Sequence, residues 1–102
     1  MSLDDKISEA LMAVGVERKA EQITVFEFAK GNSTADFVIL MTVNNRVHLD
    51  SMREYLIEAI QPFKKKGAAV VSSGDSASGW IVLDLGSIVV HLMVPELRSY
   101  YA

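Results

Sequence analysis

Two runs of strand-forming residues, separated by only two residues, constrain the fold of this chain more than any other feature. Residues 80–85 (WIVLDL) and 88–93 (IVVHLM) are rich in β-branched, aliphatic and aromatic side chains, and Gly86 and Ser87 stand between them. Two strands joined by a two-residue connection form an antiparallel hairpin, and glycine readily adopts the positive φ that such turns require. The sequence therefore predicts a β-hairpin over residues 80–93.

The predicted hairpin determines which side chains share a face of the sheet. If Leu85 lies opposite Ile88, the register continues back to Trp80 opposite Met93. Because side chains alternate between the two faces along a strand, one face is wholly aliphatic and is predicted to be core: Ile81, Leu83, Leu85, Ile88, Val90 and Leu92. The other face mixes apolar bulk with one acid and one imidazole: Trp80, Val82, Asp84, Val89, His91 and Met93.

Helical spacing of apolar residues predicts three helices. The first covers residues 3–14, with Gly15 as the expected stop. The second begins at a cap formed by the asparagine at position 44 or 45 and is ended by Pro62. A short final helix is expected over residues 95–101, where a proline stands at the first position.

Three further strands are predicted outside the hairpin. They cover residues 23–28, residues 36–43 and residues 68–71, and the nearly continuous apolar run of 36–43 fits a strand in the middle of a sheet. The small polar residues of 72–79 (SSGDSASG) predict a mobile loop. The fold class is therefore a mixed α/β sheet of the α+β type, with about five strands and a layer of helices on one face.

Length, composition and charge limit the classes of function. A chain of 102 residues fits one domain, here residues 1–102, and without cysteine it forms no disulfide or thiolate metal site. We expect neither a membrane span nor a signal peptide, because no apolar run is long enough. Ten lysines and arginines against thirteen acids give a net charge of −3, which disfavours nucleic-acid binding through phosphates and favours a basic protein partner.

The mixed hairpin face is either an ordinary half-buried sheet face or a platform that binds another protein. Tryptophan, methionine and a charged residue on a flat sheet resemble the composition of binding hot spots. Catalytic interpretations fit less well, because His91 and Asp84 stand diagonally in the register and are too few to hold a metal. Metal-dependent nucleotide transfer needs two or three converging carboxylates, and Asp84 has no partner acid in phase. We therefore expect no metal or cofactor.

The C-terminal block from Gly79 to Tyr101 reads GWIVLDLGSIVVHLMVPELRSYY. It resembles the C-terminal signature of the ribosomal silencing factor family, also called Iojap-like, which runs approximately G-x-W-V-L-L-D-[YF]-G-D-V-V-V-H-x-[FM]-x-P-E-x-R-x-[FY]-Y. The matching residues are Gly79, Trp80, Leu83, Asp84, Gly86, Val89, Val90, His91, Pro95, Glu96, Arg98, Tyr100 and Tyr101. Shorter upstream matches extend the resemblance over about residues 17–101.

The resemblance implies a nucleotidyltransferase-like fold without the catalytic carboxylates, and hence no enzymatic activity. It implies binding to the large ribosomal subunit through a basic ribosomal protein, at the face that receives the small subunit. A protein bound there blocks subunit joining sterically and represses translation when nutrients are scarce. Homodimers and, for bacterial members, a cytoplasmic location are also implied, while an organellar origin stays open. One departure is Ser87, which stands where the family usually has an acid.

The candidate contact residues combine the hairpin face with this resemblance: Trp80, Asp84, His91, Met93, Glu96, Arg98 and Tyr101. Trp80 and Met93 are expected to be apolar anchors. Asp84 and Glu96 are expected to face basic side chains, and His91 and Arg98 alternatively order the sheet edge and the final helix. Two other functions stay open: a small metal-dependent nucleotidyltransferase, and a homodimerisation module whose mixed face is consumed by self-association.

Overall fold

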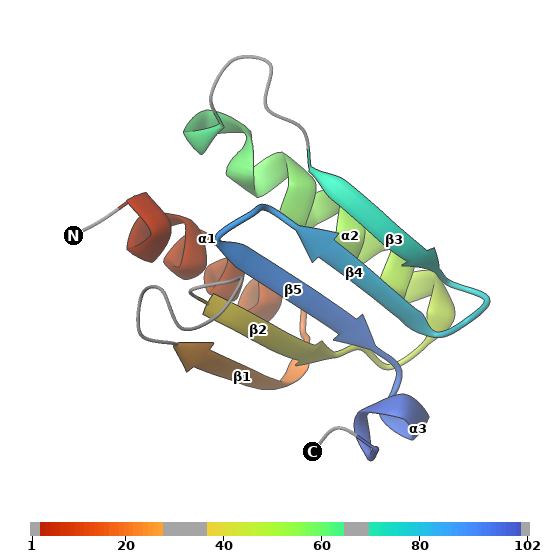
Figure 1. The fold of residues 1–102 in the computed structure, drawn as a ribbon. Coiled ribbons are helices and arrows are strands. Elements are labelled where there is room, and N and C mark those ends of the chain that lie inside the picture. Colours follow the sequence, from red (N-terminus) through yellow and green to blue (C-terminus); the bar gives the residue numbers. More distant parts are fainter. Residues whose placement is uncertain (1–2, 28–36, 65–69, 101–102) are drawn as a thin grey trace.

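A mixed five-stranded β-sheet forms the centre of the protein (Figure 1). The computed structural model describes residues 3–27, 37–64 and 70–100. In chain order the strands are β1 (Glu21–Glu27), β2 (Phe37–Thr42), β3 (Val71–Asp75), β4 (Trp80–Asp84) and β5 (Ile88–Met93). Across the sheet they follow the order β1-β2-β5-β4-β3, with β2 and β5 parallel and the other neighbours antiparallel. The predicted mixed sheet of about five strands is confirmed.

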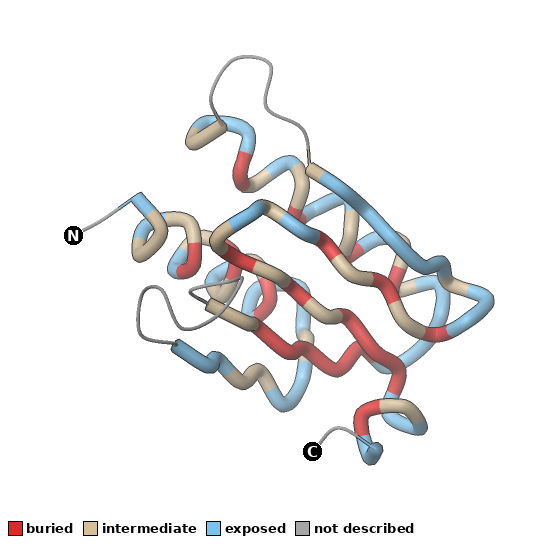
Figure 2. The backbone as a smooth tube through the Cα atoms, in the orientation of Figure 1, coloured by how far each residue is buried: buried red, intermediate tan, exposed pale blue. Residues whose placement is uncertain are grey.

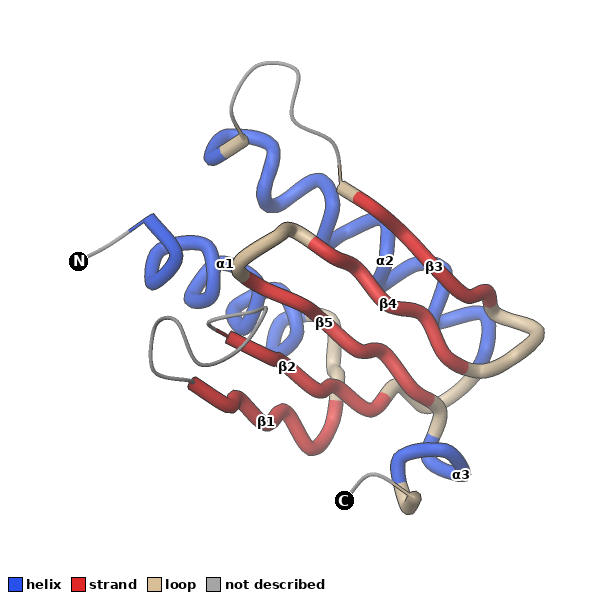
Figure 3. Tube along the Cα trace, viewed as in Figure 1, coloured by secondary structure: helices blue, strands red, loops and turns tan. Residues whose placement is uncertain are grey.

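Two long helices lie on one face of this sheet (Figure 3). The helices are α1 (Leu3–Glu17), α2 (Arg46–Ile60), the short 3-10 helix η1 (Gln61–Phe63) and α3 (Pro95–Arg98). Asn45 caps α2, since its side-chain oxygen accepts a hydrogen bond of 2.8 Å from the backbone N–H of His48. Pro62 lies in η1 directly after α2 ends. The predicted cap and the predicted proline stop of this helix are both confirmed.

The helix stop expected at Gly15 is wrong. α1 continues to Glu17, and the chain leaves the helix through Lys19, whose φ of 67° is left-handed. Gly15 is instead buried inside the helix, where a Cβ would lie 2.9 Å from Cε of Met41 and 3.1 Å from Cδ1 of Ile23. The missing side chain therefore lets α1 approach the sheet closely. Glycine occurs both at helix ends and at such close contacts, so the pattern in the sequence did not distinguish the two uses.

The loop expected over residues 72–79 is wrong for its first half. β3 covers Val71–Asp75 and pairs with β4, with Ser73 opposite Val82, and only residues 76–79 form a turn. The strand expected at residues 68–71 is thus shifted along the chain, and residues 68 and 69 lie outside the described part. All five residues of β3 are exposed, so backbone pairing with β4 stabilises this edge strand although it buries no apolar side chain.

The predicted hairpin register is confirmed, because Trp80 pairs with Met93 and Asp84 with Val89. The aliphatic face of the hairpin lies toward the helices, and its residues Ile81, Leu83, Ile88, Val90 and Leu92 are at most 1% exposed. The core that they share with β2, α1 and α2 also includes Leu11, Ile39, Met41, Leu49, Met52, Leu56 and Ile60. Figure 2 shows the buried residues concentrated on the central strands and on the inner sides of the helices.

Candidate functional site

The sheet face opposite α1 and α2, called here the open face, is covered by neither long helix (Figures 1 and 3). Residues paired across neighbouring strands lie on the same face, so the strand register extends the mixed hairpin face to both edges of the sheet. The open face consists of Glu21, Thr24, Phe26, Val38, Leu40, Thr42, Val71, Ser73, Asp75, Trp80, Val82, Asp84, Val89, His91 and Met93. It is mainly apolar on its three central strands, where Asp84 is the one acid, and each edge strand adds an acid, Glu21 on β1 and Asp75 on β3.

Trp80 and His91 contact each other on adjacent strands near one end of the open face. The indole Nε1–H donates a hydrogen bond of 3.1 Å to Nδ1 of His91, and the ring centroids lie 5.8 Å apart with an interplanar angle of 39°. Both side chains are half-buried. Burial lowers the pKa of His91 below its usual 6.5, so near pH 7 the imidazole is neutral and able to accept this bond.

Met93 and Arg98 are buried, with 1% and 6% of their surfaces exposed. The Arg98 guanidinium donates hydrogen bonds to Oγ1 of Thr24 at 2.8 Å and to Oγ1 of Thr42 at 3.2 Å, which ties α3 to β1 and β2. Packing at this end of the sheet covers the side chain of Met93, so in the free chain this expected apolar anchor lies beneath the surface. Arg98 has the ordering role for the final helix that the sequence suggested as its alternative.

Asp84 and Glu96 are the acidic candidates, and both are exposed. A side-chain oxygen of Asp84 accepts a hydrogen bond of 2.8 Å from the backbone N–H of Gly86, so this acid also stabilises the hairpin turn. Glu96 lies in the first turn of α3. Tyr101 lies outside the described residues. The structure therefore brings Trp80, Asp84 and His91 together on one face and places Glu96 on the helix that follows β5.

Two exposed apolar side chains on the open face were not among the sequence candidates. Phe26 on β1 is 46% exposed and Val71 on β3 is 60% exposed. Alternation along each strand indicates a strand, but it does not reveal which neighbours the strand pairs with or which face the helices cover. Phe26 shares the open face with the hairpin only because β2 stands between β1 and β5, and that order is set by tertiary contacts.

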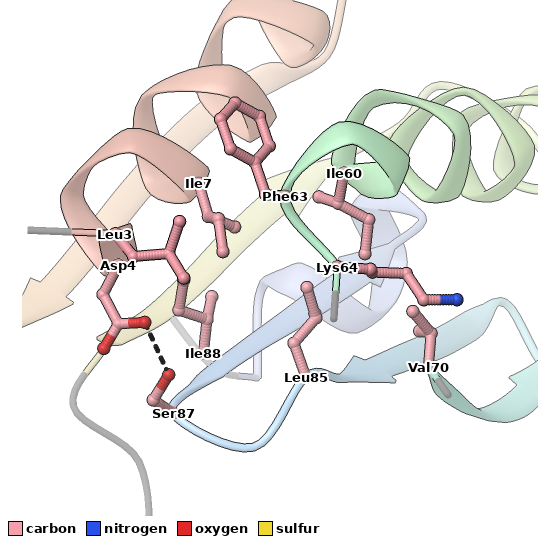
Figure 4. A pocket seen from close by; sticks show the side chains of 10 residues that line it. All are labelled: Leu3, Asp4, Ile7, Ile60, Phe63, Lys64, Val70, Leu85, Ser87 and Ile88. Atoms are coloured by element: carbon pink, nitrogen blue, oxygen red, sulfur yellow. Dashed lines mark hydrogen bonds between the residues drawn. The ribbon is translucent and has the colours of Figure 1, made fainter. Parts of the chain in front are cut away.

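A pocket of about 330 Å³ lies beside the hairpin turn, on the side of the sheet that the helices cover, between the start of α1 and η1 (Figure 4). Its lining is mainly aliphatic, and the one carboxylate among its described lining residues, Asp4, accepts a hydrogen bond of 2.8 Å from Oγ of Ser87. A hydroxyl at position 87 can donate this bond, whereas an ionised acid there would repel Asp4. The pocket thus lacks the converging carboxylates of metal-dependent nucleotide transfer.

Metal ligands and membrane spans are both absent from the described ranges. In residues 3–27, 37–64 and 70–100, no group of three or more histidines, cysteines or acids comes together to hold a metal ion. No helix within these ranges is both long enough and apolar enough to cross a membrane.

Comparisons with known proteins indicate the family of this chain. A family model described as "Ribosomal silencing factor during starvation" matches residues 2–102. "Mitochondrial assembly of ribosomal large subunit protein 1" of Mus musculus is 28% identical over 94 residues, and "Ribosomal silencing factor RsfS" of Zymomonas mobilis is 31% identical over 85 residues. These matches cover 91% and 81% of this chain, which spans 41% and 61% of the two proteins.

Solved structures support the fold independently. A crystal structure of a protein from Chromobacterium violaceum matches with a TM-score of 0.82 at 24% identity, over 99% of this chain and 82% of that chain. Three findings lead to one assignment: the sequence block at residues 79–101, the mixed sheet, and the family model that matches nearly the whole length of the chain. The chain belongs to the ribosomal silencing factor family.

Proposed function

We propose that this protein represses translation by binding the large ribosomal subunit and sterically preventing the small subunit from joining when nutrients are scarce. The open face is the observation that carries the proposal. It is a broad, mainly apolar sheet surface, and both long helices lie on its other side. Exposed apolar patches of this kind mark protein-interaction sites, and the family model is described by silencing during starvation.

Charge favours a basic ribosomal protein at the subunit interface as the direct partner. The exposed acids Asp84 and Glu96 stand on and beside the open face, and the whole chain has a net charge of −3. Complementary charge speeds association and selects partners. Trp80, Asp84, Glu96 and, from the family resemblance, Tyr101 make the contacts in this proposal. Met93 and Arg98, which are buried, and His91, which is half-buried beside Trp80, support these contacts.

The proposed role is binding and not catalysis. The relatives are named as silencing or assembly factors, and neither the open face nor the pocket beside the hairpin turn presents a set of converging acids among the described residues. The proposal includes no cofactor and no sequence-specific recognition of nucleic acid. It places the protein in the bacterial cytoplasm, where ribosomal subunits are free to be bound.

Co-sedimentation with purified large subunits tests the proposal through a pair of charge reversals. Asp84→Lys puts like charge against a basic partner and should weaken binding about tenfold or more. It also removes the acceptor for the Gly86 N–H, so a small fall in melting temperature is expected, and binding is measured well below that temperature. Glu9→Lys makes the same change in net charge on α1, on the other side of the sheet, where Glu9 is exposed. It should bind like the wild type. Equal binding by both variants would refute contact through the open face.

A joining assay separates the steric mechanism from binding alone. Large subunits saturated with the protein are mixed with small subunits, and the fraction of joined ribosomes is measured on a density gradient. We expect joining to fall as occupancy rises, and Asp84→Lys should restore it. If joining is unchanged at full occupancy, the protein binds the subunit but does not block it.

A second copy of the chain is the competing occupant of the open face. We propose that homodimers form and that ribosome binding and self-association are separable. Sedimentation velocity of the free protein, wild type against Trp80→Ala, tests this. If Trp80→Ala converts dimers into monomers, the open face is the dimer surface and the homodimerisation alternative gains support. If dimers persist while subunit binding is lost, the two surfaces are different.

A further inference from the structure

The hydrogen bond between Trp80 and His91 has a fixed direction. An indole N–H is a donor only, so Nδ1 of His91, 3.1 Å away, must present its lone pair to it. Neutral His91 therefore carries its proton on Nε2. The doubly protonated imidazolium has an N–H on both ring nitrogens, so in that form two donors would face each other and the bond would be lost.

The surroundings of His91 offer little to stabilise a positive charge. Its neighbours on the open face are mostly uncharged, namely Val89 and Met93 on β5, Val82 and Trp80 on β4, and Val38, Leu40 and Thr42 on β2. The charged groups nearest in the register are Asp84, diagonally across on β4, and Arg98, which reaches Thr42 from α3. No ion pair of His91 with any described residue is present. Burial lowers the pKa of His91.

We propose that His91 is the positioning residue of Trp80 and holds the indole in place only while the imidazole is uncharged, so that proton uptake by His91 releases the indole and changes the open face. The part of this proposal that concerns partner binding rests on the proposed function. The positioning itself concerns the free protein alone. A lower pH then weakens binding for two reasons. Trp80 is no longer held in position as an anchor, and protonated His91 puts a positive charge opposite a basic partner.

Fluorescence of the free protein tests the positioning directly, because Trp80 is the single tryptophan of the chain. Emission is followed from about pH 8 to about pH 5, the range in which histidines titrate. We expect a step in intensity or wavelength with a midpoint below 6.5. His48→Gln removes the other histidine and should keep the step, because His48 contacts the backbone oxygen of Arg18 instead.

Two substitutions of His91 complete the test. His91→Asn places a side-chain oxygen near the position of Nδ1, so it keeps an acceptor for the indole but does not titrate. We expect its emission to match that of the neutral wild type and to stay constant with pH. His91→Phe removes the acceptor and should shift the emission at every pH. Constant emission in the wild type, or an unchanged step in His91→Asn, would overturn the proposal; circular dichroism confirms that each variant is folded.

A binding arm tests the link to the ribosome with the same variants. If only the neutral form binds well, affinity for large subunits falls about tenfold at one pH unit below the fluorescence midpoint. The ratio of wild type to His91→Asn cancels any effect of pH on the subunits themselves. Equal losses in both proteins would overturn the link. If neither binds subunits at any pH, the proposed function fails, while the fluorescence result still decides whether His91 positions Trp80.

Discussion

Trp80→Ala and Leu83→Ala test whether the two faces of β4 have separate roles. The two residues lie three positions apart on one strand, so their side chains point to opposite faces of the sheet. Trp80 is half-buried on the open face, whereas Leu83 is 1% exposed and lies in the core beneath α2. Truncating Trp80 to alanine therefore removes a contact with the proposed partner, whereas truncating Leu83 removes contacts within the core.

The structure sets different magnitudes for the two changes. Leu83→Ala leaves a cavity in a fully packed core and should lower the free energy of unfolding by about 3 kcal/mol, which lowers Tm by about 12–24 °C in a domain of this size. Trp80→Ala removes the hydrogen bond to His91 and partial packing of a half-buried side chain, so its cost should be about 1–2 kcal/mol. Loss of a central aromatic anchor should weaken subunit binding by about 2 kcal/mol or more, which is about 30-fold in Kd.

Thermal melts and co-sedimentation with large subunits, done side by side, measure both quantities. Binding is measured well below the Tm of each variant, so that only folded protein is compared. We expect Leu83→Ala to melt earliest and bind normally, and Trp80→Ala to lose less stability, with a Tm about 4–16 °C below the wild type, and bind poorly. If Trp80→Ala melts as early as Leu83→Ala but binds like the wild type when folded, the assignment of the two faces is inverted and the open face is not the contact surface.

The remaining predictions concern backbone strain and the final helix. Gly74→Ala should lower the free energy of unfolding by about 2 kcal/mol or more, because φ is +79° and a Cβ would lie 2.1 Å from the backbone oxygen of Trp80. Gly86→Ala is its control, with a φ of +91° but open space around the Cβ, and should lose only about 1 kcal/mol in denaturant titrations; equal losses would contradict the clash. Arg98→Lys should cost about 1–2 kcal/mol and speed amide exchange in α3, because one ammonium cannot reach both threonine hydroxyls as the guanidinium does. Unchanged exchange there would show that packing alone holds the helix.

The hairpin was predictable because its determinants are adjacent in the chain. Gly86 and Ser87 stand between two strand-forming runs, and the connection length sets the register of every pair from Trp80 opposite Met93 onward. Period-two alternation then sorts core side chains from open-face side chains. The asparagine cap of α2 was predictable for the same reason, since Asn45 and the N–H that it binds are three residues apart.

Edge strand β3 was not predictable from its own residues. The stretch from Ser72 to Asp75 has the composition of a loop, and its strand conformation comes from pairing with β4. Gly15 shows the same limit, because its close contact with Met41 on β2 depends on how α1 packs against the sheet. Local propensity is a weak prior that such tertiary contacts override.

The sequence by itself determined the alternating faces of the hairpin, the asparagine cap of α2 and the family block at residues 79–101, because each depends on residues close together in the chain. Only the tertiary structure decided which candidates are accessible. Met93 and Arg98 are in the predicted set but buried, and Phe26 on a distant strand joins the open face. Exposure depends on what long-range packing places over a side chain, and the order of strands and helices in space is fixed by contacts among segments far apart in sequence.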